Sequence, residues 1–513
     1  MLVKVYGASV QGLSAIPVTI EVNASRGIKF FLVGLPDSAV KESHERIVAA
    51  IENSGFRFPS RQIVVNMAPA DIRKEGAGYD LPLAIGILAA DDKVRLDKLA
   101  HTMMLGELSL DGSLQPVKGA LSVAIKAREM GFEHLIVPEQ NVREAAVVNR
   151  LKVYGAAHIG QVIRFLNEDA GLAPLDVDTR AEFYARQAEF DFDFADVKGQ
   201  AYVKRALEVA AAGGHNVIMI GPPGSGKSMM AKCLPSILPP LSLAESLETT
   251  QVHSVAGKLT GDSSLIARRP FRAPHHTISQ VALVGGGANP QPGEVSLAHN
   301  GVLFCDELPE FSRSVLEVLR QPLEDRKINI SRAKYSITYP CSFMFVASMN
   351  PCPCGYYNHP TKTCVCTSGQ IYRYLHKISG PLLDRIDLQC EILPLSFEEM
   401  SKAVPGENSA SIRERVICAR RIQEQRFAGI TGVHCNAQMT DRQLHDYCAL
   451  SSESSALLRS AMERLQLSAR AYSRILKVSR TIADLDNSED IQIQHIAEAV
   501  GYRNLDRGDW AER

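Results

Sequence analysis

A glycine-rich segment in the middle of the chain has the composition of a phosphate-binding loop. Residues 221–228 match the pattern G-x-x-x-x-G-K-[ST], between the apolar run Val217–Ile220 and a predicted helix. The glycines let backbone N–H groups face phosphates, the lysine reaches the β- and γ-phosphates, and the serine ligates Mg²⁺. The alternative is a glycine-rich turn that binds no ligand. Such a turn would not require a lysine and a serine directly after its last glycine. The residues expected to bind ATP and Mg²⁺ are Gly221, Pro222, Pro223, Gly224, Ser225, Gly226, Lys227 and Ser228.

Two carboxylates end an apolar run farther along the chain. Val302–Cys305 predicts a buried strand, which Asp306 and Glu307 follow. Asp306 suits Mg²⁺ and Glu307 suits polarising an attacking water, whereas acids that cap the next helix are the alternative. A second apolar run, residues 343–348, delivers Asn350, a polar group placed to orient that water. These residues predict a site that hydrolyses ATP.

Cysteine is distributed unevenly. None of the 11 cysteines precedes Cys233, and two C-x-C pairs lie close together after Asn350. Four thiolates suit tetrahedral Zn²⁺, which would hold a loop that has little core of its own and leave no position open for chemistry. His359 could replace one ligand, and an iron–sulfur cluster is a further alternative. The expected ligands are Cys352, Cys354, Cys364 and Cys366.

Two basic segments are candidates for contact with a polyanion. Residues 268–279, RRPFRAPHHTIS, precede a glycine-rich stretch, and residues 326–339 alternate polar and apolar side chains around a basic tip. The alternation predicts a β-hairpin, for which a solvated tip without a ligand is the alternative. A metal site at His275 and His276 is disfavoured because adjacent side chains of a strand point in different directions. The candidate DNA contacts are Arg268, Arg269, Arg272, Arg332 and Lys334.

The elements that position these residues belong to more than one domain. A chain of 513 residues is too long for one compact core. The net charge of −1 gives no global basic field, so any nucleic-acid binding must use local patches. The longest apolar stretch, residues 81–90, is too short to span a bilayer, and the first residues lack a signal-peptide layout. We expect a cytoplasmic protein with no membrane partner.

Periodicity divides the chain into four regions. Residues 1–170 alternate strand and helix patterns, including a helix that Asp37 could cap and a hairpin over residues 105–117. Residues 171–196 are charged and weakly periodic, which is typical of a linker. Residues 197–392 form a second α/β pattern, and residues 393–513 are predicted to be helical.

The nucleotide-site motifs and residues 380–387, GPLLDRID, resemble the AAA+ branch that includes magnesium chelatase motor subunits and MCM helicases. The resemblance implies that Arg385 completes the site of a neighbouring subunit. A salt bridge to Asp384 or Asp387 is the alternative.

A segment near the C-terminus resembles another element of the same branch. Residues 468–474, SARAYSR, are similar to the second-sensor helix of its helical lid. Arg470 is the better match for the sensor arginine, with Arg474 one turn along the same face as its substitute. Either side chain could instead be a helix surface charge.

The basic segments and the N-terminal region resemble known families as well. Residues 268–279 are similar to a signature of the chelatase-like subgroup, in an insertion within the second helix of the core that faces the ring pore. Related motors grip DNA with a hairpin in the position of residues 326–339. Residues 106–141 resemble the proteolytic domain of Lon, yet no serine lies between Ser60 and Ser109 and Leu121 occupies the lysine position. The resemblance implies a pseudoprotease scaffold.

The order of these parts resembles the YifB/ComM family over essentially the whole chain. It implies an α/β fold: a Lon-protease-like α+β domain, a P-loop AAA+ parallel-sheet core and a helical lid. The implied function is an ATP-dependent hexameric DNA helicase that promotes branch migration during DNA uptake and recombination. A chelatase-type motor that remodels a protein partner is the alternative, which the N-terminal domain disfavours. The missing Ser–Lys pair disfavours a protease, and the intact phosphate loop disfavours a non-catalytic scaffold.

Overall fold

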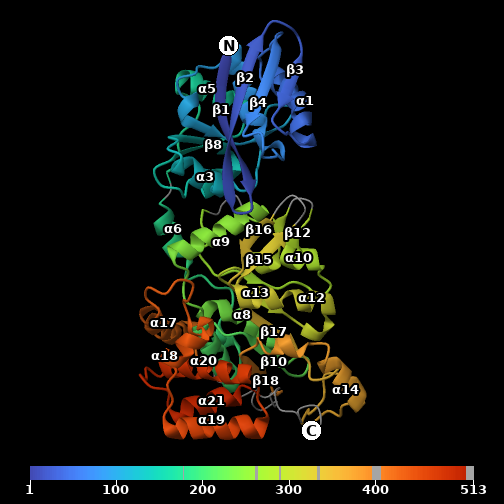
Figure 1. Cartoon of the computed structure of the whole chain (residues 1–513), viewed down its shortest axis with the longest axis vertical. Helices are drawn as coiled ribbons and strands as arrows, with labels where there is room; N and C mark the ends of the chain where they lie inside the picture. The colour runs from blue at the N-terminus through green and yellow to red at the C-terminus, as the bar shows by residue number, and fades with distance from the viewer. Residues whose placement is uncertain (177, 260–263, 288–289, 332–335, 395–405, 504–513) are drawn as a thin grey trace. The chain divides into compact units, whose positions relative to one another are not determined.

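The structure, a computed structural model, describes residues 1–176, 178–259, 264–287, 290–331, 336–394 and 406–503 (Figure 1). The chain divides into two compact units. The first combines Met1–Arg186 with Ser242–Ala267, and the second combines Gln187–Leu241 with Arg268–Arg513. Within the described residues, no helix is both long and apolar enough to cross a membrane.

The first unit is built on a seven-stranded mixed sheet with the strand order β3-β4-β2-β1-β5-β8-β9. β1 pairs antiparallel with β2 and β2 with β4, whereas β1–β5, β5–β8, β8–β9 and β3–β4 are parallel. The strands are β1 (Leu2–Gln11), β2 (Ser14–Ser25), β3 (Phe30–Val33), β4 (Gln62–Ala68), β5 (Thr102–Met104), β8 (His134–Pro138) and β9 (Lys152–Ala156). The helices are α1 (Ser38–Asn53), α2 (Asp80–Ala90), α3 (Ala120–Glu129), α4 (Val142–Ala145), α5 (Ile159–Glu168), α6 (Thr179–Arg186) and α9 (Leu243–Ala256).

Local sequence signals account for several of these elements. Asp37 caps α1 by accepting a 2.8 Å hydrogen bond from the backbone N–H of Val40. Val18, Ile20 and Val22 of β2 are all buried, as their alternation predicts. The expected hairpin is formed by the short strands β6 (Glu107–Leu108) and β7 (Leu114–Gln115).

A helix lies inside the segment that was expected to be a linker. α6 belongs to the first unit and buries Phe183, which is 2% exposed. Glu182 of α6 pairs with Arg143 at 2.7 Å and accepts a 2.7 Å hydrogen bond from Ser264. Because one buried aromatic residue and one ion pair anchor this helix, its sequence shows little amphipathic periodicity.

The helix α9 follows the nucleotide-loop helix in the sequence but belongs to the first unit. Gln251 donates to the carbonyl oxygen of Leu13 at 2.7 Å and contacts the Ser122 hydroxyl at 3.2 Å. The backbone N–H of Gly119 donates to the carbonyl of Ser254 at 3.1 Å. The chain therefore leaves the second unit after Leu241, adds one helix to the first unit, and returns to the second at Arg268.

The second unit contains a five-stranded parallel sheet with the order β11-β14-β17-β10-β18. Its strands are β10 (Val217–Ile220), β11 (Phe271–Arg272), β14 (Val302–Cys305), β17 (Met344–Met349) and β18 (Leu388–Glu391). The carboxyl ends of parallel strands meet at one edge, which is where ligands bind in open α/β sheets. The phosphate loop follows β10, Asp306 follows β14 and Asn350 follows β17, so the topology brings the predicted site together.

Short elements surround this sheet. β15 (Lys327–Ser331) pairs antiparallel with β16 (Ser336–Pro340), which confirms the predicted hairpin. β12 (Gly285–Gly286) pairs antiparallel with β13 (Gln291–Pro292). The helices are α7 (Ala201–Gly213), α8 (Lys227–Ile237), α10 (Gln280–Val284), α11 (Glu294–Leu297), α12 (Arg313–Val318), α13 (Arg320–Asp325), α14 (Ser368–Leu375) and α15 (Gly380–Leu383).

The described part of the C-terminal region beyond residue 405 is helical, as expected. Its helices are α17 (Ser409–Arg426), α18 (Asp441–Tyr447), α19 (Ser452–Leu465), α20 (Ala469–Leu485) and α21 (Ile493–Gly501). Buried residues such as Val416 of α17 and Ile482 of α20 join one hydrophobic core with Val217 of the sheet. Asp484, with a fully buried side chain, accepts hydrogen bonds from Arg426 at 2.5 and 2.8 Å and from Arg480 at 3.1 Å.

Candidate nucleotide and metal site

The phosphate loop joins β10 to the N-terminus of α8. Gly224 and Gly226 have φ angles of +77° and +87°, a backbone region that favours glycine. The Lys227 ammonium is buried and donates to the carbonyl oxygens of Gly221 and Pro222 at 2.7 and 2.8 Å. Burial lowers the pKa of Lys227, while the neighbouring carboxylates act to raise it. The cation thus lies inside the loop, at the place where a phosphate would take over its hydrogen bonds.

Asp306 and Ser228 meet across the edge of the sheet. The Ser228 hydroxyl donates to Asp306 Oδ2 at 2.7 Å, and the Ser348 hydroxyl donates to Asp306 Oδ1. A hydroxyl and a carboxylate in contact at the start of the phosphate-loop helix form the donor set that Mg²⁺ takes in phosphate-loop proteins. Ser348 was not among the predicted site residues. A polar residue near the end of the otherwise apolar strand β17 is the signal that could have identified it.

Glu307 has an unusual backbone conformation. Its φ is +52°, a left-handed conformation that non-glycine residues rarely adopt and that is found at functional sites. The backbone N–H of Glu307 donates to Asp306 Oδ1 at 3.1 Å. The Glu307 carboxylate lies 3.9 Å from Nδ1 of His276. Sequence reasoning placed His276 only in a pore-facing segment and missed this proximity, because 31 residues separate the two in the chain.

Asn350 lies beside the phosphate loop. Its side-chain oxygen accepts a 3.2 Å hydrogen bond from Lys227, and the backbone N–H of Gly221 donates to the carbonyl of Met349 at 3.2 Å. The strand end that carries Asn350 is therefore attached to both ends of the phosphate loop. The structure brings together Lys227, Ser228, Asp306, Glu307 and Asn350 at one edge of the sheet.

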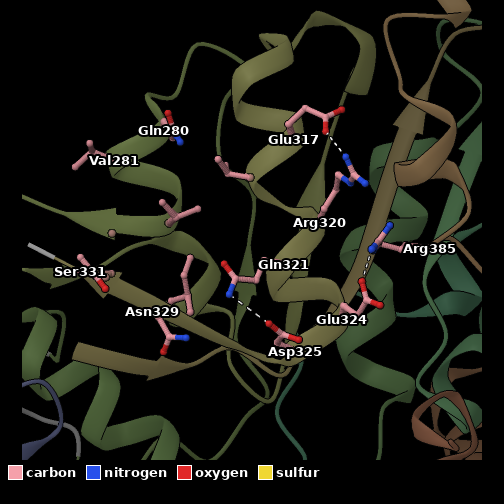
Figure 2. A pocket seen from close by; sticks show the side chains of 15 residues that line it. Gln280, Val281, Glu317, Arg320, Gln321, Glu324, Asp325, Asn329, Ser331 and Arg385 are labelled. Atoms are coloured by element: carbon pink, nitrogen blue, oxygen red, sulfur yellow. Dashed lines mark hydrogen bonds and ion pairs between the residues drawn. The ribbon is translucent and has the colours of Figure 1, made fainter. Parts of the chain in front are cut away.

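The arginine with an expected role across subunits, Arg385, has partners within its own chain. Arg385 pairs with Glu324, and its Nη1 donates to the carbonyl of Pro381 at 2.7 Å (Figure 2). Arg385 lines a cavity of about 870 Å³. Figure 2 shows its guanidinium beside Glu324, with Arg320 and Glu317 as a second pair on the same wall. Within the described residues, the buried Arg385 Nε has no hydrogen-bond partner.

The two aspartates flanking Arg385 pair with the lid instead. Arg470 donates to Asp384 at 3.2 Å and is 66% exposed, whereas Arg474 donates to the buried Asp387 at 2.8 Å. Both candidate sensor arginines therefore connect α20 to the segment that carries Arg385. Arg470 is the more exposed of the two, so its ion pair constrains its side chain less than the pair with Asp387 constrains Arg474.

Three of the candidate DNA-contact arginines are held by neighbouring groups. Arg272 forms a double hydrogen bond with Glu294 at 2.6 and 2.7 Å. Arg269 donates to the carbonyls of Pro239 and Asn300 at 2.6 and 2.8 Å, and Arg268 to that of Glu189 at 2.7 Å. These contacts fix the segment beside β11. The other two candidates, Arg332 and Lys334, lie outside the described residues.

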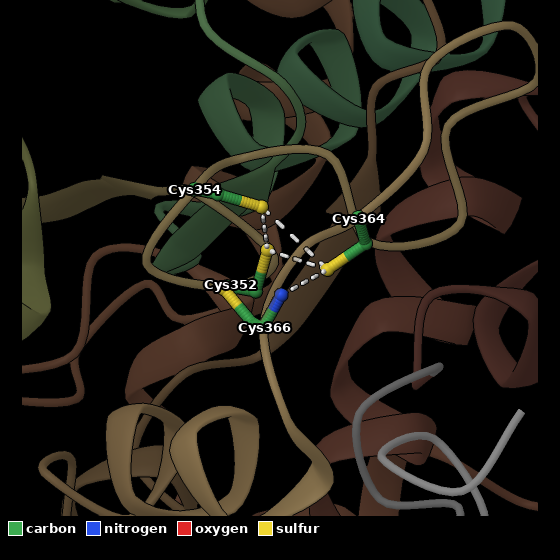
Figure 3. Close-up of side chains that lie close together, drawn as sticks. All are labelled: Cys352, Cys354, Cys364 and Cys366. Atoms are coloured by element: carbon green, nitrogen blue, oxygen red, sulfur yellow. Dashed lines mark hydrogen bonds between the residues drawn. The ribbon is translucent and has the colours of Figure 1, made fainter.

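The four predicted cysteine ligands converge (Figure 3). All four Sγ atoms lie within 4.8 Å of one another. Cys352 Sγ is 3.4 Å from Cys354 Sγ and 3.7 Å from Cys364 Sγ, close to the edge of a Zn–S₄ tetrahedron, about 3.8 Å for Zn–S bonds of about 2.3 Å. The donor set and its spacing fit a structural Zn²⁺. His359 turns its Nδ1 to the backbone N–H groups of Thr361 and Lys362.

The positions that hold the Ser–Lys dyad in Lon-type proteases carry other residues in the first unit. Residues 76–80, where the nucleophile of a Lon-type protease would fall, contain no serine, and Leu121 in the lysine position is fully buried in apolar surroundings. Asp80 pairs with Arg46 at 2.8 Å. Burial raises the pKa of Asp80 to about 6, against the opposing effect of the Arg46 charge. An ion pair therefore lies beside the place where a Ser–Lys dyad would be needed.

The parallel sheet, the phosphate loop and the carboxylates at the strand ends define an AAA+ core, joined to a Lon-like unit and a helical lid. Three sequence families match: "Magnesium chelatase, subunit ChlI" over residues 193–400, "Subunit ChlI of Mg-chelatase" over 20–141, and "Magnesium chelatase, subunit ChlI C-terminal" over 406–503.

Full-length relatives give the finer assignment. The chain is 44% identical to YifB of Escherichia coli K12 over 97% of this chain and 96% of that protein. It is 44% identical to competence protein ComM of Haemophilus influenzae over 99% and 98%. Lon protease 2 of Bacillus subtilis is 34% identical over 28% of this chain and 27% of that protease. The chain belongs to the YifB/ComM family of magnesium-chelatase-like proteins.

Proposed function

We propose that this protein is an ATPase that assembles into a hexameric ring and translocates on DNA, moving branched junctions during DNA uptake and recombination in the cytoplasm. The ATPase proposal rests on one observation: Lys227, Ser228 and Asp306 lie together at one edge of the sheet, with Glu307 beside them. The similarity to a competence protein over the whole chain supports the DNA substrate.

The geometry supports a division of roles among these residues. Ser228 and Asp306 would hold Mg²⁺, which neutralises phosphate charge when bound. Lys227 would exchange its two carbonyl partners for phosphate oxygens. Glu307 would polarise the attacking water, and Asn350, tied to Lys227, would orient it. Because these groups are already in place, binding requires little rearrangement of the chain.

The position of Arg385 supports a site completed by a neighbouring copy. Its guanidinium borders an open cavity, is 14% exposed and comes from an element remote in sequence from the phosphate loop. An arginine supplied across a subunit contact stabilises the charge that develops on the transferred phosphoryl group. In a ring, each copy would insert Arg385 beside the nucleotide of the next, and Arg470 of the lid would contact nucleotide from its own copy.

The hairpin of β15 and β16 supports the DNA-translocating part of the proposal. Arg332 and Lys334 occupy its tip in sequence, and β15 starts directly after α13, which contributes Glu324 to the Arg385 pair. Movement at the subunit contact would therefore be transmitted to the hairpin through α13 and β15, which are consecutive in the chain. Regularly spaced phosphates can be held by basic tips without reading the base sequence.

One measurement separates this proposal from its alternative. ATP turnover is measured alone, with a four-way DNA junction, and with unfolded protein as a control. The DNA proposal expects stimulation of turnover by the junction, together with its movement. Stimulation by protein and none by DNA, at low salt, would favour the second candidate, a chelatase-type motor that remodels a protein partner. That candidate draws on the family match of the core over residues 193–400.

The cysteine cluster is proposed to hold one structural Zn²⁺. The four sulfur atoms would fill all four positions of a tetrahedral Zn²⁺, so the metal would stabilise the loop after Asn350 and take no direct part in hydrolysis.

A further inference from the structure

The turn that follows the second cysteine ligand lies against the phosphate loop. Gly355 is buried, has a φ of +83°, and donates its backbone N–H to the carbonyl of Cys352 at 3.0 Å. A Cβ atom at this position would lie 2.5 Å from Cδ and 2.8 Å from Cγ of Pro223. Real Cβ atoms do not approach other heavy atoms so closely, so any side chain at residue 355 must displace Pro223 or the turn.

Pro223 belongs to the part of the phosphate loop whose backbone must face the nucleotide. It directly precedes Gly224, which has a φ of +77°, so a shift of the proline ring changes the direction of the following N–H groups. The proline ring is exposed. The turn at Gly355 is therefore a support on the outer side of the loop, while Met349 and Asn350 hold its two ends.

The turn itself depends on the cysteine centre. Residues 351–367 form no helix or strand, and only Pro351, Cys352 and Gly355 among them are buried. Such a segment has little apolar surface to fix it, so metal–thiolate bonds would be its main source of order. Gly355 is bonded to the ligand Cys354 and hydrogen-bonded to the ligand Cys352, so its position follows that of the metal centre.

We propose that Gly355 is a positioning residue through which the metal centre supports the phosphate loop, so that metal occupancy sets the affinity for ATP. The proposal rests on the ATP and metal sites proposed above. It assigns the cysteine centre a role in nucleotide binding, carried by one contact with Pro223, in addition to its role in loop stability.

The test measures two quantities separately: metal content by elemental analysis, and affinity for a slowly hydrolysed fluorescent ATP analogue with Mg²⁺. Gly355→Ala should keep one metal per chain and bind the analogue at least tenfold more weakly. Gly429→Ala is the matched control, because Gly429 also has a φ of +83° but nothing lies within 4 Å of its added Cβ. Its affinity should stay within twofold of wild type.

Metal removal is then combined with the Gly355→Ala substitution, so that the effects of each change alone and of both together can be compared. Chelation should weaken ATP binding about tenfold in wild type and less than twofold further in Gly355→Ala, since both changes act on the same contact. Pro223→Ala removes the ring atoms that the Cβ meets, so Gly355→Ala with Pro223→Ala should bind the analogue as Pro223→Ala alone does.

Three results would overturn the proposal: unchanged affinity in metal-loaded Gly355→Ala, effects of substitution and chelation that multiply, or no rescue by Pro223→Ala. If Gly355→Ala fails to fold, Pro223→Ala decides, because its affinity should be insensitive to the metal-loading level. If the chelated chain fails to fold, the metal-loaded variants decide: Gly355→Ala should still bind at least tenfold more weakly than wild type, and the two substitutions combined should bind no more weakly than Pro223→Ala alone. Two other results concern the proposed sites themselves. Wild-type protein that carries its metal yet binds no ATP would refute the proposed ATP site. Wild-type protein that contains no metal as purified, before any chelation, and binds ATP would refute the metal site.

Discussion

Arg385 pairs with Glu324, 61 residues away in the chain, and with neither of the aspartates beside it in the sequence. Asp384 and Asp387 are taken by Arg470 and Arg474 of the lid. Glu324 is 66% exposed, so its partner can leave it at little cost. The pair therefore holds Arg385 ready at the edge of a cavity and does not lock it in place.

If Arg385 acts across a subunit contact, replacing Arg385 and replacing its partner Glu324 should affect ATP turnover differently. Arg385→Ala should bind nucleotide normally and lose about 10³-fold or more in turnover, the range for an arginine supplied in trans. Mixed with wild type, it should reduce turnover more than in proportion. Glu324→Gln should keep turnover within about threefold, because the arginine remains. Equal losses in the two variants, measured by steady-state ATPase assays, would make the pair structural.

Glu307→Gln tests the water-polarising role. The substitution keeps the size of the side chain and removes the base, so hydrolysis should fall at least about 100-fold while nucleotide affinity stays within a few-fold. Binding is measured by titration with a fluorescent ATP analogue and turnover by phosphate release. Glu310→Gln is the control, since Glu310 pairs with Lys377 at 3.4 Å nearby. Near-normal turnover in Glu307→Gln would remove this assignment.

The metal site predicts one Zn²⁺ per chain in protein purified without added metal. Cys352→Ser should lower the metal content to a small fraction and reduce thermal stability, because three thiolates hold Zn²⁺ less tightly than four. Cys418→Ser is the matched control, an exposed free cysteine on α17. Elemental analysis decides, and a folded, active wild-type protein without metal would contradict the assignment.

Charge reversal at the hairpin tests the DNA contact. Arg332→Glu combined with Lys334→Glu should abolish DNA-stimulated hydrolysis and junction movement while basal ATP binding persists, because repulsion replaces attraction to phosphates. Reversal of Arg459 and Arg464, two exposed arginines of α19, changes the net charge equally and should leave stimulation intact. Stimulation that survives in the hairpin variant would exclude the hairpin from the mechanism.

Asp484 predicts a stability effect that is independent of catalysis. Its buried carboxylate is shared by Arg426 and Arg480, so Asp484→Ala leaves two poorly solvated guanidinium groups without their anion. The expected loss is about 3–5 kcal/mol in the free energy of unfolding, measured by urea denaturation. Asp446→Ala, at a half-exposed aspartate of α18, should cost less than about 1 kcal/mol. Similar values for both variants would refute the argument.

Much of the fold and of the nucleotide site could be predicted from the sequence because their signals are local. The phosphate loop, the carboxylates after Val302–Cys305 and the position of Asn350 follow from contiguous motifs and from the rule that parallel strand ends share an edge. The cysteine ligands lie within 15 residues, and the hairpin of β15 and β16 follows from alternation. Each inference needed only neighbouring residues or one topological rule.

The tertiary structure decided which distant groups meet. The sequence placed two aspartates near Arg385, but in the fold Arg385 pairs with Glu324. The pairing of Arg272 with Glu294 is likewise visible only in the fold. The assignment of α9 to the first unit and the contact of Gly355 with Pro223 belong to the same class. Charged side chains have many chemically equivalent partners along a chain of this length, and only the packing of the backbone selects the one within reach.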